Sequence, residues 1–555
     1  MRRAQHWCFS FFLLWCFNTG SFAQIAPDTY WVQFSDKDNT PYSLSQPEQF
    51  LSQRAMDRRA AYGIAYDELD LPVDPAFIAA VLATGDVQLL NRSKWFNAIT
   101  IRTTDHAAIL LIQELPFVQA VRSRSSAVVP AHPTSKFAQL ATVQDRDGEE
   151  YGPSFLQIEM LNGQELHALG AKGQGVLIGV LDSGFDGVDS ALAFQPMRDR
   201  GGLVLTRDLV AHDGDVFQDH WHGRSVLSTM VAVLDGQLLG TAPEADYVLL
   251  RTEDAGTEFP VEEDNWISGA ELADSLGCDV LNTSLGYTTF DDSTMDHTYA
   301  DLDGQTLRIS IAANIASRKG MIPVCSAGNN GSSDWHYISA PADAIGVLTV
   351  GAVGDVENYA PFSSHGPSAD GRVKPDVCAM GWGTTILRSD VDSVVAANGT
   401  SFASPILAGL VACLWQLHPG RTNEEIMDAV RRSASFFNAP SDSLGYGVPD
   451  FGAAHILLQM STGVADASSK AELHLFPVPF RDELFVQLPV GVNGQVGVAF
   501  FDATGRLVGH ENISANAAGM VRLGSDRLGV LSHGAYVVQV QQQGRVWQQQ
   551  LIKAP

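Results

Sequence analysis

The stretch Gly399-Thr400-Ser401-Phe402-Ala403-Ser404-Pro405 decides how the rest of the sequence is interpreted. It joins a glycine turn to a strongly apolar segment that continues to Leu417, which predicts a buried helix beginning beside Ser401. A hydroxyl at the amino end of a helix lies at the positive end of the helix dipole, which favours a developing oxyanion. Packing alone gives little reason for this combination of residues. Ser401 is therefore the candidate nucleophile.

Two shorter segments supply the groups that such a serine needs. Val180-Leu181-Asp182-Ser183-Gly184 places an acid at the end of an apolar strand, and His222-Gly223 opens a segment of small and apolar residues. A serine hydroxyl needs a base within hydrogen-bond reach, and an imidazole serves because its pKa lies near neutrality. A buried carboxylate then fixes the tautomer of the imidazole. Taken alone, Asp182 also fits a turn or helix cap; together the three segments predict nucleophilic acyl transfer.

A fourth segment, Ser326-Ala327-Gly328-Asn329-Asn330-Gly331, directly follows the apolar run 322–325. The side-chain N–H of Asn329 can donate to a tetrahedral oxyanion together with the backbone N–H of Ser401. The alternative interpretation is an ordinary Asn-Gly turn in a loop. The presence of the other three segments favours the oxyanion role.

Apolar runs of strand length alternate with helical stretches through the middle of the chain. Strands that are apolar on both faces and separated by helices indicate a parallel sheet covered on both sides, which is an α/β fold. In such sheets the functional groups gather at the carboxyl ends of the strands. The predicted strands are 176–181, 247–250, 280–285, 322–325 and 347–350, and two of the predicted helices are 225–234 and 263–276.

From Tyr151 to Leu458 the chain resembles the subtilases, the subtilisin-like serine proteases, in the order Asp, His, Ser and in the sequences around these residues. Further matching segments are Asn282-Thr283-Ser284-Leu285-Gly286 and Gly240-Thr241-Ala242-Pro243. The resemblance implies a subtilisin-like catalytic domain with a parallel sheet. The residue roles that it implies are Asp182, His222 and Ser401 as the catalytic triad, Asn329 as the oxyanion donor, and Ser284, Leu285, Gly286, Ala327 and Gly328 as the two walls of the pocket for the side chain before the scissile bond.

The sequence departs from the family pattern in three places, one of which is the stretch Tyr287 to Gln305, longer and more acidic than in compact subtilases. Arg224-Ser225 follow His222-Gly223 where the family usually has Thr-His, so the base remains but nearby substrate contacts differ. The loop Asp235-Gly236-Gln237 is shorter than the calcium-binding loop of the family, so that calcium site is not expected. We expect no cofactor, and leave a structural calcium elsewhere open. A catalytic metal on His212, His220 and His222 is disfavoured, because their spacing is not the helical spacing of zinc peptidases.

The composition and the N-terminus indicate an exported protein. The chain has 555 residues and a formal net charge of −28, which argues against a nucleic-acid partner because a polyanion is repelled. Residues 1–23 read as a removable signal peptide, with Arg2 and Arg3, a short apolar run and the small-x-small site Ser21-Phe22-Ala23. That run is too short to span a bilayer, and no later stretch is apolar enough. We expect a secreted or cell-surface protein without a membrane span in its mature form.

Four cysteines follow the signal peptide: Cys278, Cys325, Cys378 and Cys413. None has the spacing of a metal site, and Cys325 and Cys413 lie in apolar runs. We expect buried free thiols, with a disulfide as the open alternative in an exported protein.

The regions on either side of the central domain differ from it in their predicted secondary structure. Residues 27–127 form a small α+β unit that resembles subtilase propeptides, which assist folding and inhibit the enzyme until cleaved, and 128–150 read as an exposed linker that contains the cut. After the domain 151–458 and a second linker at 459–472, residues 473–555 predict a small β-sandwich. Its segments Leu475–Phe480, Phe501–Leu507 and Gly534–Lys553 resemble the sorting domain of type IX secretion cargo of Bacteroidota, although Val478 stands where an asparagine is usual. A carbohydrate- or protein-binding β-module is the alternative.

Two hypotheses follow. The first is a secreted serine endopeptidase made as an inactive precursor, with protein or peptide substrates, its own propeptide and the secretion machinery as partners. The second is a surface binding or adhesion protein on a catalytically silent subtilase scaffold. The C-terminal β-module and Arg224-Ser225 motivate the second hypothesis, whereas the presence of every catalytic residue favours the first.

Overall fold

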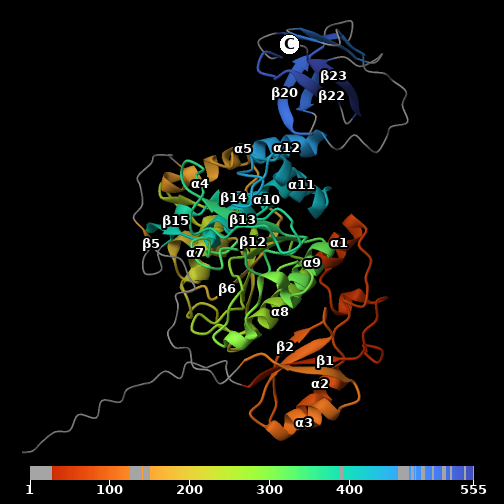
Figure 1. Cartoon of the computed structure of the whole chain (residues 1–555), viewed down its shortest axis with the longest axis vertical. Helices are drawn as coiled ribbons and strands as arrows, with labels where there is room; N and C mark the ends of the chain where they lie inside the picture. The colour runs from red at the N-terminus through yellow and green to blue at the C-terminus, as the bar shows by residue number, and fades with distance from the viewer. Residues whose placement is uncertain are drawn as a thin grey trace, which may run out of the picture.

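The computed structural model describes residues 28–125, 140–141, 150–387, 392–460 and, with short gaps, 474–553. Three units follow one another along the long axis of the molecule (Figure 1). The N-terminal unit lies beside helices α8 and α9 of the central unit, and the C-terminal unit lies beside α11 and α12 at the other end. The predicted signal peptide lies outside the described residues.

The N-terminal unit is an antiparallel sheet with two helices and an additional segment. The sheet has the order β2-β3-β1-β4, and its interior contains Val32, Ile99 and Ile101. Its elements are β1 (Thr29–Phe34), α2 (Pro75–Leu82), β2 (Gln88–Ser93), β3 (Ala98–Arg102), α3 (His106–Glu114) and β4 (Val118–Ser123). The predicted α+β layout is confirmed, although the sequence analysis did not identify α2, which begins with the cap Asp74 and Pro75.

The additional segment joins β1 to α2. It contains a 3₁₀ turn, Pro47–Gln49, and the helix α1 (Gln53–Tyr62). The two are separate because Ser52 lies in extended backbone and its hydroxyl accepts from the N–H of Ala55, which caps the start of α1.

The described residues of the central unit form a seven-stranded parallel sheet of order β14-β13-β12-β11-β6-β10-β7. Its central strands are buried on both faces, which explains their continuous apolar runs. The predicted α/β class is confirmed. The strands are β6 (Leu177–Asp182), β7 (Leu203–Asp208), β10 (Asp246–Arg251), β11 (Val280–Thr283), β12 (Ile322–Ser326), β13 (Leu348–Val353) and β14 (Val377–Met380).

Helices cover both faces of this sheet. On one face, α7 (His222–Val231) and α10 (Thr400–Leu417) pack in one apolar cluster that includes Val226, Ile406 and Leu410. On the other, α8 (Val261–Leu276) and α9 (Arg308–Arg318) pack in a second cluster with Trp266 and Ile309. In the part of the chain that the structure describes, α10 is the one helix long and apolar enough to cross a membrane, and 89% of it is buried inside the protein.

Smaller elements surround the sheet. A three-stranded sheet, β15-β16-β5, includes residues 140 and 141 of the predicted linker, which pair with Ala397 and Ala396. The four cysteines after residue 27 are buried and form no disulfide, as predicted. The elements are β5 (Leu140–Ala141), α4 (Phe155–Glu159), α5 (Gly163–Ala168), α6 (Gln195–Asp199), β8 (Val233–Leu234), β9 (Leu238–Leu239), β15 (Trp382–Leu387), β16 (Val394–Asn398), α11 (Asn423–Arg432) and α12 (Phe451–Met460).

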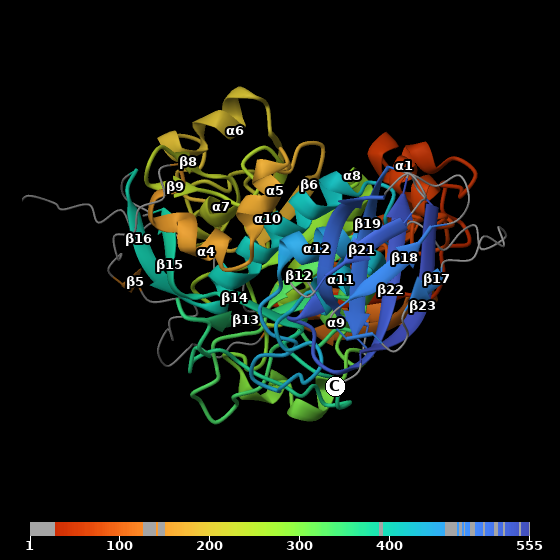
Figure 2. The same ribbon diagram turned by 90° about the horizontal axis from the view of Figure 1, so that it is seen from above.

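The C-terminal unit has two antiparallel sheets, β17-β18-β21 and β20-β19-β22-β23, with a shared core of apolar side chains (Figure 2). This is the predicted small β-sandwich. Its strands are β17 (His474–Phe476), β18 (Leu484–Gln487), β19 (Gln495–Asp502), β20 (Leu507–Ser514), β21 (Met520–Leu523), β22 (Gly534–Gln542) and β23 (Arg545–Lys553).

Candidate active site

Asp182 and His222 form a buried pair at the carboxyl end of β6. His222 is the first residue of α7, and its Nδ1 lies 2.8 Å from Oδ1 of Asp182, with both side chains fully buried. The same Oδ1 accepts from the N–H of Ser183 at 2.8 Å. Gly223 allows this approach, because a Cβ there would lie 2.3 Å from the carbonyl oxygen of Gly184. The pairing directs the other imidazole nitrogen, Nε2, away from the carboxylate.

His220 supports this pair. Its Nδ1 lies 3.0 Å from the Ser183 hydroxyl and accepts from the N–H of His222 at 3.3 Å. The His220 side chain is half-buried and joins the first residue of α7 to the end of β6.

Ser401 lies in the first turn of α10, with 6% of its surface exposed. Its hydroxyl donates to the carbonyl oxygen of Ser284 at 3.3 Å, while the Ser284 hydroxyl donates to the carbonyl of Ser401 at 2.8 Å. The ring of the next residue, Phe402, has its centroid 5.9 Å from that of His222. The predicted nucleophile therefore lies between the end of β11 and the Asp182–His222 pair, with its hydroxyl directed at Ser284.

Asn329 lies beside the same helix start. Its Oδ1 accepts from the N–H of Thr400 at 2.9 Å and from the Thr400 hydroxyl at 3.1 Å. Because a backbone N–H can only donate, these bonds establish which end of the amide is the oxygen. The amide NH₂ of Asn329 therefore remains as the donor end beside Ser401. The sequence analysis did not identify Thr400 as the residue that orients Asn329, although it precedes the nucleophile directly.

The five predicted substrate-binding residues follow two adjacent strands. Ser284, Leu285 and Gly286 continue β11, and Ala327 and Gly328 continue β12. Gly286 is exposed and approaches Ser339 so closely that a Cβ would lie 2.0 Å from the Ser339 hydroxyl. The two strand ends thus place their backbones next to Ser401.

The start of α8 carries three acidic residues, Glu262, Glu263 and Asp264, and all three are buried. Arg124, at the end of β4, contacts Glu263 at 2.9 Å and Asp264 at 3.0 Å. Burial alone would raise the pKa of Glu263, but the hydrogen bond and charge of His297, together with Arg124, lower it to about 2. Glu263 and Asp264 therefore bind Arg124 of the N-terminal unit.

The residues of the disfavoured metal interpretation do not assemble. Among the described residues, the one group of three or more ligand-type side chains within 4.8 Å of one another is Glu253, Glu258 and Glu262, with no histidine in it. Instead His222 bonds to Asp182 and His220 to Ser183. The Tyr287 hydroxyl donates to Glu253 at 2.8 Å, next to the residues that follow β11.

Three family models match successive parts of the chain. Residues 173–447 match the subtilase family, residues 29–139 match a peptidase S8 propeptide domain of Bacteroidota, and residues 474–554 match a secretion system C-terminal sorting domain.

Individual relatives match the same central region. Subtilisin E of Bacillus subtilis strain 168 is 29% identical over 310 residues, which cover 55% of this chain and 71% of the relative. Subtilisin of Bacillus pumilus is 29% identical over 287 residues, 51% of this chain and 92% of the relative. Among solved structures, MycP1 from Mycobacterium smegmatis aligns with 58% of this chain and 88% of its own at 22% identity and a TM-score of 0.44.

The family matches and the subtilisin relatives support an exported serine endopeptidase. Its central region is similar to the subtilase family, with a match to a propeptide domain before it and a match to a sorting domain after it. The sorting domain directs the protein to the cell surface or outside the cell.

Proposed function

We propose that this chain hydrolyses peptide bonds through Ser401, His222 and Asp182, and that it is made as an inactive precursor. The observation that carries the proposal is the buried Asp182–His222 hydrogen bond at the end of β6, next to the helix start that holds Ser401. Three different strand or helix ends converge there, as expected of a catalytic site at the carboxyl edge of a parallel sheet.

The reaction begins when the Ser401 hydroxyl rotates from Ser284 toward His222. His222 Nε2 accepts the hydroxyl proton as Oγ attacks the scissile carbonyl carbon, and Asp182 holds the Nδ1–H and stabilises the imidazolium. The oxyanion accepts hydrogen bonds from the Ser401 N–H and the Asn329 amide NH₂. His222 then returns the proton to the leaving amine, and water hydrolyses the acyl-enzyme by the same steps.

The substrate backbone lies extended along Ser284, Leu285 and Gly286, where it continues the parallel sheet by strand addition. The exposed backbone at Gly286 supports this placement, because a glycine there leaves room beside Ser339. The side chain before the scissile bond lies between this strand and Ala327-Gly328. No metal takes part in the proposed steps; a structural calcium is left to metal analysis of the purified protein.

In the precursor the propeptide, whose described part is residues 28–125, contacts the catalytic domain at the start of α8. Arg124 at its C-terminal end is half-buried and contacts Glu263 and Asp264. The last described residues of the propeptide therefore lie at the carboxyl edge of the sheet, where the site lies. Cleavage in the linker before residue 150 is the proposed activating step.

The test is labelling with a serine-directed fluorophosphonate, combined with intact mass, on wild type, Ser401→Ala and Ser404→Ala. Ser404 is a matched control because it lies on the same helix and its hydroxyl donates to Asn282 at 2.9 Å, away from the proposed chemistry. Wild type and Ser404→Ala are expected to label and to lose the propeptide, and Ser401→Ala to do neither. A folded wild type that neither labels nor processes itself would contradict the proposal and favour the binding or adhesion protein.

A further inference from the structure

The segment between β1 and α2, residues 36–72, leaves the four-stranded body of the propeptide and contacts the catalytic domain separately. Figure 1 shows its helix α1 beside α9, at a distance from α3 and the sheet of the body. We call residues 36–72 the anchor segment. Its contacts with the catalytic domain carry the inference below.

The anchor segment binds the amino-terminal edge of the catalytic sheet. Arg54 donates to the carbonyl oxygens of Gly175 at 2.7 Å and Gly277 at 2.9 Å, and Arg58 donates to that of Cys278. These residues precede β6 and β11, whereas Asp182 lies at the far end of β6. Because a six-residue strand is roughly 20 Å long, the anchor segment is about that far from the proposed active site.

The C-terminal part of the anchor segment extends this contact to two more helices. The ring of Tyr62 stacks on Trp415 near the end of α10, with centroids 6.0 Å apart. Lys319, at the end of α9, contacts Asp67 at 2.7 Å and Asp70 at 2.9 Å. The anchor segment therefore touches α8, α9 and α10 at their C-terminal ends.

Buried charges link the two surfaces. Asp274 of α8 is fully buried and contacts Arg58 at 2.7 Å, Arg59 at 2.7 Å and, from the propeptide body, Lys94 at 3.0 Å. Arg59 also contacts Asp70, so the network runs from α8 through α1 to Lys319. The propeptide and the catalytic domain each supply charges of both signs, so the two surfaces are complementary in charge. Removing one partner of such a buried network leaves an uncompensated charge, which is far more costly than losing a surface ion pair.

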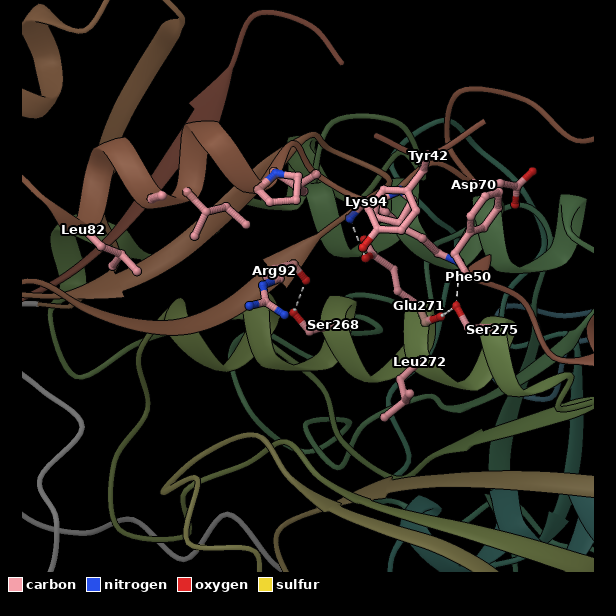
Figure 3. A pocket seen from close by; sticks show the side chains of 15 residues that line it. Tyr42, Phe50, Asp70, Leu82, Arg92, Lys94, Ser268, Glu271, Leu272 and Ser275 are labelled. Carbon is pink, nitrogen blue, oxygen red and sulfur yellow. Dashed lines mark hydrogen bonds between the residues drawn. The ribbon is translucent and has the colours of Figure 1, made fainter. Parts of the chain in front are cut away.

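The body of the propeptide makes a second contact along α8, which meets the first at Asp274 through Lys94. Asn91 donates to Asn265 at 2.6 Å, and the Ser93 hydroxyl donates to Glu271 at 2.6 Å. A cavity of about 650 Å³ lies between the two contact areas, with Leu82 on the side of the body and Tyr42, Phe50 and Asp70 on the side of the anchor segment (Figure 3). The propeptide thus has two contact areas.

We propose that the anchor segment is a retention site: it holds the cleaved propeptide on the catalytic domain through the edge of the sheet opposite the active site. The body positions the linker toward the active site, whereas the anchor segment determines how long the propeptide stays bound after the linker is cut. The proposal rests on the proposed function only in taking residues 28–125 as the described part of the propeptide. It does not require that Ser401 be active.

The test uses the full chain with Ser401→Ala, which keeps the precursor uncut, and a site for a sequence-specific protease placed between residues 128 and 139. After cutting, the release rate of the propeptide is measured by gel filtration and intact mass. Arg58→Met with Arg59→Met leaves Asp274 with Lys94 alone, and we expect release to be on the order of 10²-fold faster. Tyr62→Ala is the milder variant, with an expected acceleration of about tenfold from the lost ring contact.

Arg92→Met is the matched control, because it removes an exposed arginine from the propeptide body and keeps the backbone carbonyl that accepts from Ser268 of α8. Its release rate is expected to equal that of the parent. Equal rates for the parent and the anchor variants would overturn the proposal. A second measurement needs no variant: after cutting, the amides of α1 are expected to remain as protected from hydrogen exchange as before, and loss of their protection while the propeptide stays bound would also overturn it.

Discussion

Thr400 shows how a single neighbouring residue can prepare a catalytic donor. Its N–H and hydroxyl both donate to Asn329 Oδ1, so the amide cannot turn over without losing two hydrogen bonds. The sequence could indicate Asn329 as an oxyanion donor but not this orientation, because residues 329 and 400 are joined only by the packing of β12 against α10. The orientation is a product of the fold.

Asn329→Ala removes the side-chain oxyanion donor, and we expect kcat to fall about 10²–10³-fold with little change in KM. The reason is that this hydrogen bond strengthens only when the oxyanion forms. Asn329→Asp is the companion variant, since it keeps an acceptor for Thr400 and lacks the NH₂ group. Steady-state kinetics on a peptide substrate measure both. If Asn329→Asp retained wild-type kcat, Asn329 would not be the donor.

Glu271 gives the retained propeptide a dependence on pH. It is buried under the propeptide, and this burial raises the pKa of its carboxyl to about 7, although Ser93 and the N–H groups of Lys94 and Trp95 oppose the rise. Once the propeptide leaves, the pKa returns toward its ordinary value near 4.5. The bound state therefore holds the proton more tightly. The contribution of Glu271 to propeptide binding is complete below about pH 4.5 and is lost as the pH rises through about 7.

Two neighbouring charged groups, Asp274 and Lys37, titrate in pH ranges different from that of Glu271. Burial alone would raise the pKa of Asp274, but Lys94, Arg59 and Arg58 hold it well below its ordinary value, so its contribution is lost only on strong acidification. Burial lowers the pKa of Lys37 to about 8. We therefore expect the cut Ser401→Ala chain to release its propeptide about tenfold faster at pH 7.5 than at pH 5, and Glu271→Gln to release it at one rate. The same pH profile for both proteins would exclude Glu271 as the cause.

At the scale of elements, the start of α7 depends on how closely it approaches the end of β6. A Cβ on Gly223 would lie 2.3 Å from the carbonyl oxygen of Gly184 and 2.9 Å from the Cβ of Asp182. Backbone cannot yield as a flexible side chain can, so Gly223→Ala displaces the first turn of α7 and His222 with it. We expect at least a 10²-fold fall in kcat/KM with far-UV circular dichroism unchanged. Gly420→Ala is the control, because a Cβ there would meet open space, and this variant is expected to retain activity. Gly214→Ala would not serve, because the φ of Gly214 is positive. Full activity of Gly223→Ala would show that the close approach is not required.

The sequence predicted the elements of the catalytic core better than those of the propeptide, for a physical reason. The strands of the parallel sheet are buried on both faces, so each appears in the sequence as a continuous apolar run that can be recognised without knowledge of distant residues. In α1, Arg58 and Arg59 are buried because Asp274, more than 200 positions away, neutralises them. Burial that depends on a distant partner leaves no local periodicity. The same applies to Arg124, whose partners begin α8.

At the scale of the whole molecule, the two flanking units attach to the catalytic domain in different ways. The propeptide contacts it through a buried charge network and a second area along α8. The described hydrogen bonds of the C-terminal sandwich to the central domain are fewer: Arg432 donates to the carbonyl of Gly505 at 2.6 Å, Gln541 to that of Gln459 at 3.2 Å, and Asn438 to Asp502 at 3.4 Å. Phe501 and Leu507 also pack against the core of the central domain. The sandwich also has its own core, which includes Phe480, Val498 and Val538. It is therefore built as an independent unit, in keeping with a sorting role.

A chain ending at residue 460, after α12, tests this independence. Because the sandwich contributes few contacts and no residue of the proposed site, we expect the purified, processed protein to keep kcat/KM within about twofold of the full chain and to unfold at a similar temperature. Export is expected to be lost, since the sorting domain is gone; fractionation of cells would find the truncated protein retained inside the cell envelope. Replacing Arg432 by Met in the full chain is the control for the lost contact alone, and it should remain exported. Normal export of the truncated chain would show that residues 474–554 are not the sorting signal, and a large fall in kcat/KM would show that the sandwich supports the catalytic domain directly.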